Sequence, residues 1–335
     1  MQWHRALRNP PYIPRLPRLV TASEDRAMTF HKAISLFMFS VCLAPPLLKA
    51  EDDAKKTPEK TASANEDNAD EQNKDAEKAV QLVPDSQLRE VILEIKRRRQ
   101  IEGDEITMDD LQNVWSLDAS RKGIRDLTGL EHCVNLGDAK FTGNEIVDVS
   151  PLKSCGSLQL LDLADNQVKD PSSLGNLKKL QYLNLENNQV QSLSGLEDCV
   201  ALNSLYAAGN AIVSIEPVAK LQKLWSLDLS RNKIEDIAPV AQLDRLSQLG
   251  LADNRIIDIS PIPPGNGMYS TYLSGNKIAD IGPLVKLAQT DAEGDRRFAS
   301  FWRLYLNDNP LSDQSKTEGL ESLRKAGVRL NPEKS

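Results

Sequence analysis

Hydrophobic positions in the chain recur with a fixed spacing of 22 residues. The clearest instance is residues 158–168, LQLLDLADNQV, which follows the pattern L-x-x-L-x-L-x-x-N-x-V. The asparagine that marks each regular unit recurs at Asn144, Asn166, Asn188, Asn210, Asn232, Asn254 and Asn276. Lys122 holds the marker position of an earlier unit, and Asn309 follows after a longer step of 33, which makes about nine units.

Each unit is expected to contain a short strand whose side chains alternate between two faces. Leu183 and Leu185 therefore point to the same side. Stacking of units buries this side and contributes roughly 1.5–3 kcal/mol per leucine. The marker asparagine lies where the chain leaves the strand, and its amide can bind backbone groups of its own turn and of the adjacent unit. We predict a structural role for these asparagines.

Acidic residues recur four positions after the markers, in the turn that follows each strand: Asp126, Asp148, Asp170, Asp236, Asp258 and Asp280. Aspartate accepts hydrogen bonds from nearby backbone N–H groups in turns. Calcium would need a denser cluster of oxygen ligands than this spacing supplies. We therefore predict turn capping and no metal site.

The two ends of the array differ from the repeats, which span residues 115–311. Residues 81–114 are expected to form a helical N-terminal cap with a solvated basic run at 96–99, and a capping box formed by Thr107 and Asp110. Residues 312–335 are expected to form a C-terminal cap with a helix and a final strand. The longer unit before Asn309 predicts a protruding loop near 286–298.

The cap sequence VPDSQLREVILEI, which leads into 22-residue units, resembles the internalin-type bacterial leucine-rich repeat family. The resemblance implies an α/β leucine-rich repeat solenoid. Such a solenoid has a parallel β-sheet on the concave face, short 3-10 turns on the convex face, a helical N-terminal cap and a C-terminal helix cap. It also implies a secreted or surface-exposed protein that binds other proteins.

The N-terminal residues predict export. Residues 1–50 carry seven Lys or Arg against two acids and include the apolar run AISLFMFSVCLA, which is typical of a signal peptide cleaved near Ala50, with Met28 as a candidate true start. Residues 51–80 form an acidic segment expected to be a disordered linker. Without residues 1–50 the chain has 34 basic and 46 acidic residues, a net charge of −12. This charge argues against a nucleic-acid partner, and no membrane span is expected after cleavage.

The candidate chemistry is limited. Cys133 and Cys155 lie one unit apart, about 5 Å by the strand spacing, so a disulfide between them and two buried free thiols are both open. His132 has no Cys or Asp partner at ligand spacing, and no catalytic or nucleotide-binding motif appears. We predict a protein that is not an enzyme and needs no cofactor.

Aromatic and acidic residues on the predicted strands suggest a binding surface. Tyr206, Tyr272 and Tyr305 all lie four positions before a marker asparagine, in a register that points away from the core. The predicted ligand-binding residues of the concave face are Asp162, Tyr182, Tyr206, Trp225, Asp228, Tyr272, Trp302 and Tyr305. The alternative is that Tyr and Trp occur here because they favour strands.

These patterns predict an exported protein that binds a protein or peptide, with basic character suggested by the acidic residues, across its concave face. A glycan ligand is less favoured. One alternative is a structural spacer of the cell envelope without a dedicated ligand. The other is an intracellular regulatory subunit, which requires that the N-terminus is not cleaved.

Overall fold

The structure, a computed structural model, describes residues 82–264 and 267–331. The predicted signal peptide (1–50) and acidic linker (51–80) lie outside these residues. The described residues all belong to one compact unit.

Ten short parallel strands form one open sheet, with each strand beside the next one in the sequence. They are β1 (Ser116–Asp118), β2 (Asp138–Lys140), β3 (Leu160–Asp162), β4 (Tyr182–Asn184), β5 (Ser204–Tyr206), β6 (Ser226–Asp228), β7 (Gln248–Gly250), β8 (Ser270–Tyr272), β9 (Arg303–Tyr305) and β10 (Arg329–Leu330). The pairing keeps the repeat register, because Leu161 lies opposite Leu183 and Leu183 opposite Leu205. The predicted parallel sheet is confirmed.

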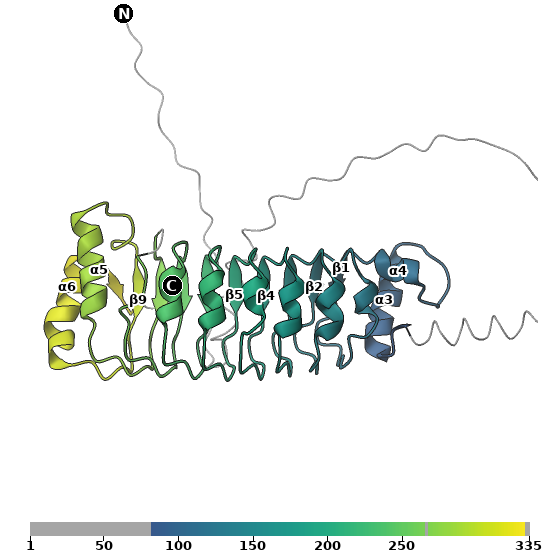
Figure 1. Cartoon of the computed structure of the whole chain (residues 1–335), viewed down its shortest axis with the longest axis horizontal. Coiled ribbons are helices and arrows are strands. Elements are labelled where there is room, and N and C mark those ends of the chain that lie inside the picture. Colours follow the sequence, from purple (N-terminus) through teal and green to yellow (C-terminus); the bar gives the residue numbers. More distant parts are fainter. Residues whose placement is uncertain (1–81, 265–266, 332–335) are drawn as a thin grey trace, which may run out of the picture. The chain divides into compact units, whose positions relative to one another are not determined.

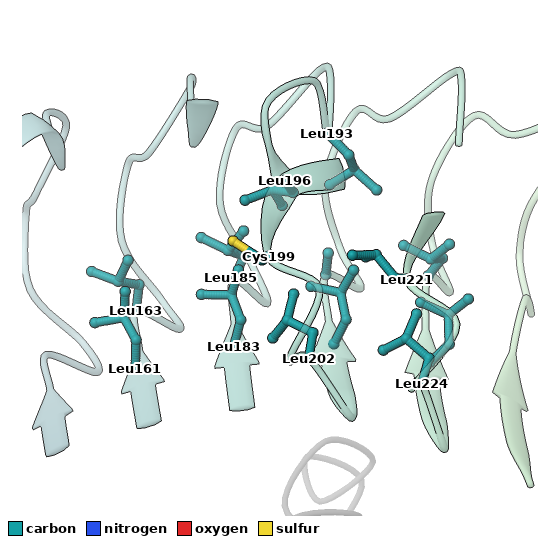
Figure 2. Packing of buried hydrophobic residues seen from close by; sticks show 14 of the residues in the cluster. Leu161, Leu163, Leu183, Leu185, Leu193, Leu196, Cys199, Leu202, Leu221 and Leu224 are labelled. Carbon is teal, nitrogen blue, oxygen red and sulfur yellow. The ribbon is translucent and has the colours of Figure 1, made fainter. Parts of the chain in front are cut away.

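The core lies between the sheet and the turns on its other side. The middle residue of each regular strand points inward, and so does the residue after the strand, as Leu183 and Leu185 show. Figure 2 shows these leucines stacked unit upon unit, together with Leu193 and Leu196 from the turns. Since every inward side chain contacts its equivalents in the neighbouring units, the hydrophobic core is continuous along the array.

The marker asparagines join each unit to the one before it. The Asn188 side-chain N–H group donates to the carbonyls of Leu163 (2.9 Å) and Leu185 (3.1 Å). Its Oδ1 accepts from the N–H of Val168 at 2.9 Å. Asn166 makes the equivalent contacts one unit earlier. The predicted structural role of the asparagines is confirmed.

Short 3-10 helices form the side opposite the sheet, as expected: η1 (Leu130–His132), η2 (Ser150–Ser154), η3 (Ser172–Asn176), η4 (Leu196–Asp198), η5 (Glu216–Lys220) and η6 (Ala238–Gln242). The recurring aspartates lie just before them. Asp148 accepts from the N–H of Ser150 at 2.8 Å, and Asp236 accepts from that of Ala238 at 2.8 Å. These contacts confirm the turn-capping interpretation.

The N-terminal cap contains α3 (Ser86–Arg98) and α4 (Met108–Gln112), which lie at one end of the array in Figure 1. Thr107 and Asp110 form the predicted capping box at the start of α4. The prediction of a fully solvated basic run at 96–99 is wrong for Lys96. This residue is buried and donates to the Glu105 carbonyl (2.6 Å) and to Asp110 (3.0 Å).

The opposite end contains α5 (Gly282–Glu293), a π-helical turn (Ser315–Gly319) and α6 (Leu320–Lys325), which is followed by β10. The loop predicted near 286–298 is instead mostly α5. Leu284, Ala288 and Asp291 form its buried side at helical spacing. The Asp291 carboxylate accepts the N–H groups of residues 297–299, which fixes the turn back into β9.

Candidate ligand-binding face of the sheet

The side of the sheet that faces away from the core, here called the sheet face, is formed by the first and third residues of each strand. From β3 to β9 the third-residue positions form one row: Asp162, Asn184, Tyr206, Asp228, Gly250, Tyr272 and Tyr305. Adjacent positions in this row are about 5 Å apart, the spacing of neighbouring strands. The repeat therefore aligns side chains that are far apart in the sequence.

Two tyrosine pairs lie on the sheet face. The rings of Tyr272 and Tyr305 are stacked, with centroids 4.5 Å apart and planes 9° from parallel. The rings of Tyr182 and Tyr206 are tilted by 45° at a centroid distance of 5.5 Å. Tyr182, Tyr272 and Tyr305 are half-buried. Aromatic pairs of this kind stabilise one another, so each pair holds a defined position on the face.

Tyr206 differs from the expectation in its exposure. It lies on the sheet face and outside the hydrophobic core cluster, but only 1% of its surface is exposed. Its hydroxyl forms a 3.1 Å hydrogen bond with Ser226 Oγ. Burial raises the pKa of Tyr206, and likewise that of Tyr272, to about 12. The predicted register is correct, but the prediction that Tyr206 is an outward-exposed anchor is wrong.

Asp228 and Gly250 lie between the two tyrosine pairs along the array. Asp228 Oδ1 accepts from the N–H of Ser230 at 2.9 Å, which fixes the direction of the carboxylate. A Cβ atom added to Gly250 would overlap this carboxylate, so Asp228 leans over the glycine. Its negative charge also contributes to the raised pKa values of Tyr206 and Tyr272, which places the carboxylate near both.

Glu186, which the sequence analysis did not select, belongs to the same acidic region. It lies two residues after β4, is 8% exposed, and has a pKa raised to about 7 by burial and by the charges of Asp228, Asp162 and Asp165. The Arg231 charge acts in the opposite direction. The repeat register could have pointed to Glu186, because the equivalent positions in the neighbouring units carry the small residues Ala164 and Ala208.

The two tryptophans predicted as ligand-binding residues, Trp225 and Trp302, do not lie in this row, because each comes just before a strand. Trp225 precedes β6 and is 45% exposed at the border of the sheet. Trp302 holds the equivalent place before β9 but is completely buried in the core, so its assignment to the ligand-binding face is wrong. Its indole N–H donates to Thr271 Oγ1 at 2.8 Å, because Thr271 stands where most other units have leucine and leaves room for the ring.

The three cysteines of the repeats are free thiols in the structure and are buried in the core, as Figure 2 shows for Cys199. The Cys155 thiol donates to the Leu130 carbonyl at 3.1 Å. The disulfide considered between Cys133 and Cys155 is therefore not formed in this structure. Burial raises the pKa of both thiols to about 12, so neither is a reactive thiolate at neutral pH.

No group of three or more His, Cys, Asp or Glu side chains in residues 82–264 and 267–331 is arranged to hold a metal ion. In the same ranges, no helix has both the length and the apolar character that crossing a membrane requires.

Comparison with known proteins shows which repeat and which fold the chain resembles. Residues 156–198 match a family model described as leucine rich repeats in two copies. A crystal structure of internalin C2 from Listeria monocytogenes is 29% identical, with a TM-score of 0.57, and the match covers 62% of this chain and 92% of that chain. The chain is a leucine-rich repeat protein whose fold is similar to that of an internalin. A search of curated protein sequences found no match.

A second solved structure supports the leucine-rich repeat fold of the chain. The leucine-rich repeat ectodomain of the plant membrane receptor kinase GASSHO1/SCHENGEN3 from Arabidopsis thaliana is 23% identical, with a TM-score of 0.51. The match covers 61% of this chain and 26% of that one, and the receptor was crystallised in complex with CASPARIAN STRIP INTEGRITY FACTOR 2. The leucine-rich repeat fold is typical of non-enzymatic proteins that bind other proteins.

Proposed function

We propose that this protein is exported and binds a basic protein or peptide segment across its sheet face. The observation that carries the proposal is the fixed Asp228 carboxylate, which leans over Gly250. Tyr272 is half-buried and close to Asp228, so it offers an aromatic wall for a cation held by the carboxylate. A lysine or arginine side chain of the partner fits this combination of charge and aromatic surface.

The remaining residues of the row extend the contact surface. Asp162 lies three strands from Asp228, about 14 Å away by the strand spacing, and its Oδ1 also accepts a backbone N–H two residues later. Glu186 lies between these two aspartates along the array and is partly ionised at neutral pH, because its pKa is raised to about 7. An extended segment with basic residues at intervals can therefore contact several acids, while the stacked rings of Tyr272 and Tyr305 supply apolar contacts.

The proposal can be tested with a random heptapeptide display library selected against the full-length protein. We expect enrichment of peptides that contain lysine or arginine. The Asp228→Asn variant should bind the enriched peptides at least about tenfold more weakly, because a fixed carboxylate loses its charge. Gly250→Ala should also weaken binding, since the added Cβ displaces the carboxylate without changing the net charge.

Two control variants distinguish an effect at Asp228 and Gly250 from the effect of a changed net charge or an added Cβ elsewhere. Asp244→Asn makes the same change in net charge at an exposed residue outside the row, and Gly156→Ala adds a Cβ where no atom lies within 4 Å. Both should bind like the wild type. Enriched peptides without basic residues, or equal binding by Asp228→Asn and Asp244→Asn, would show the proposal to be wrong. Export is tested separately by the N-terminal residue of the mature protein, and an intact N-terminus would contradict it.

A further inference from the structure

A band of uncharged residues follows the border of the sheet where the strands begin. It consists of residues 159–160, 181–182, 203–204, 225–226, 247–248 and 269–270, and we call it the strand-start band. None of its twelve side chains is charged, although 27% of the residues in the chain are. Its side chains are amides, hydroxyls and aromatic rings, with one leucine. The band is thus chemically unlike the acidic row beside it.

The backbone holds the band in a fixed geometry. The N–H of Gln181 donates to the carbonyl of Gln159, and the N–H of Asn203 donates to that of Gln181, at 2.8 and 2.9 Å. The same contact continues from Trp225 to Asn203 at 2.8 Å, and from Ser247 to Trp225 and Tyr269 to Ser247, both at 2.9 Å. Because this ladder is unbroken, side chains from six strands form one rigid platform.

Two exposed aromatic side chains lie on this platform. Trp225 is 45% exposed and Tyr269 is 52% exposed. Two strand spacings separate them, which is about 10 Å and close to the length of a disaccharide. Ser247 lies between them, buried and donating to the Gly267 carbonyl at 3.1 Å, so the surface between the rings stays low.

Amide groups continue the band on the other side of Trp225. Gln159 and Gln181 are exposed and joined by a 3.4 Å hydrogen bond between Nε2 of Gln181 and Oε1 of Gln159, and Asn203 next to them is half-buried. An amide can donate and accept at the same time, which suits a sugar hydroxyl because it also does both. The flat apolar C–H face of a pyranose ring stacks on an indole or phenol ring.

We propose that the strand-start band binds a neutral oligosaccharide chain, at a site separate from the peptide-binding row. Trp225 and Tyr269 would stack on alternate sugar rings, and the amides of residues 159, 181 and 203 would bind hydroxyl groups further along the chain. A protein partner is less well matched, since protein surfaces carry charges that the band cannot pair. Lys223 and Arg245 are exposed beside the band, so an anionic polysaccharide is included in the test.

The experiment measures binding of three neutral hexasaccharides, built from cellulose, chitin or maltose units, to the full-length protein by calorimetry. We expect at least one to bind, and the Trp225→Ala/Tyr269→Ala double variant to bind it at least about tenfold more weakly. Because both side chains are exposed, the double variant should keep the wild-type circular dichroism spectrum. Trp115→Ala is the matched control, since Trp115 is 58% exposed in the same register but is separated from the uncharged band by the charged residue Asp138 of β2. This variant should bind like the wild type.

Several results would overturn the proposal. They are no binding of any of the three sugars, equal affinity of the double variant and the wild type, or an equal loss in Trp115→Ala. Binding of polygalacturonate alone, abolished by high salt, would assign the surface to an anionic ligand through Lys223 and Arg245. The Asp228→Asn variant should keep its sugar affinity, so the two proposed sites can fail independently.

Discussion

The regular units from β2 to β7 and the later region from β8 to β9 are built on the same repeat, but they differ in unit length and in which side chains are buried. In the regular units each strand follows the last by 22 residues and has a buried middle residue, as with Leu205, Leu227 and Leu249. In the later region Thr271 replaces the leucine, and α5 lengthens the next unit. A repeat position therefore determines the direction of a side chain only while the neighbouring units have the same length and carry core residues of the same size.

Trp225 and Trp302 make this difference concrete. Both immediately precede a strand, and both hold the same register in the sheet. In the regular region Leu224 is buried and Trp225 is exposed, whereas in the later region Phe301 is 55% exposed and Trp302 is buried. The chain that leaves α5 enters β9 by a different path and turns the second of the two residues inward, towards Thr271.

The two tryptophans should differ most in how much their replacement lowers the free energy of unfolding. Trp302→Ala should lower the free energy of unfolding by about 3–5 kcal/mol, because it opens a large cavity in the core. Trp225→Ala should change it by less than about 0.5 kcal/mol, as for other exposed positions. Urea denaturation followed by circular dichroism measures both. Similar losses in the two variants would contradict the opposite burial of the two residues.

A second comparison concerns the marker asparagines. Asn188→Ala should cost about 2–4 kcal/mol, because the buried groups of Leu163, Leu185 and Val168 lose their hydrogen-bond partner. Asn309 makes the equivalent contacts in the later region but is half-exposed, so water can replace its amide and Asn309→Ala should cost only about 1 kcal/mol. The urea midpoints of the two variants measure the difference. A larger loss in Asn309→Ala would reverse the expected order.

The two regions should also respond oppositely to pH. Burial is the largest cause that raises the pKa of Glu186 to about 7, above its usual 4.5. Glu186 therefore contributes stability below about pH 4.5 that is lost as the pH rises through about 7, by roughly 2–3 kcal/mol. For Asp291, burial acts to raise the pKa, but the N–H groups of Ala299, Phe298 and Arg297 together lower it below 3.8. Asp291 contributes stability at neutral pH that is lost as the pH falls through its lowered pKa.

Melting temperatures measured from acidic to neutral pH test whether Glu186 and Asp291 change the stability in opposite directions. Glu186→Gln should remove most of the loss of stability near neutral pH, and Asp291→Asn should reduce the loss at acidic pH. Gln and Asn keep the side-chain size, so packing changes little. A Glu186→Gln curve parallel to that of the wild type would contradict the raised pKa.

The smallest expected effect concerns the thiols of the regular units. Since Cys133 and Cys155 are free and buried, adding reductant should leave the urea midpoint unchanged, whereas loss of a disulfide would cost about 2–4 kcal/mol. The thiols should react with iodoacetamide only after denaturation. A mass lower by two protons for the unreduced fragment that contains both cysteines would show a disulfide instead.

The sequence predicted which residues lie on the sheet face, but it did not predict how far their side chains are exposed to solvent. Register alone places Tyr206, Asp228, Tyr272 and Tyr305 in one row, because side chains alternate along a strand and the strands repeat at a constant interval. The 1% exposure of Tyr206 and the burial of Trp302 depend on which groups lie beside them in space. The repeat register could have singled out Glu186 as an acid at a position where neighbouring units carry alanine, but its raised pKa depends on burial near three other acids, which the register does not record.

By itself, the amino-acid sequence determined the repeating unit, the parallel sheet, the asparagine ladder and the capped ends. Each of these follows from spacing along the chain and from the hydrogen-bonding capacity of single residues. The three-dimensional arrangement was needed to see that α5 replaces a loop and that Lys96 and Trp302 are buried. It was also needed to find the Cys133 and Cys155 side chains buried as thiols in this structure and the pKa of Glu186 raised to about 7. Burial, thiol geometry and electrostatic environment are set by neighbours from other units, and these neighbours change wherever the repeat loses its regular length.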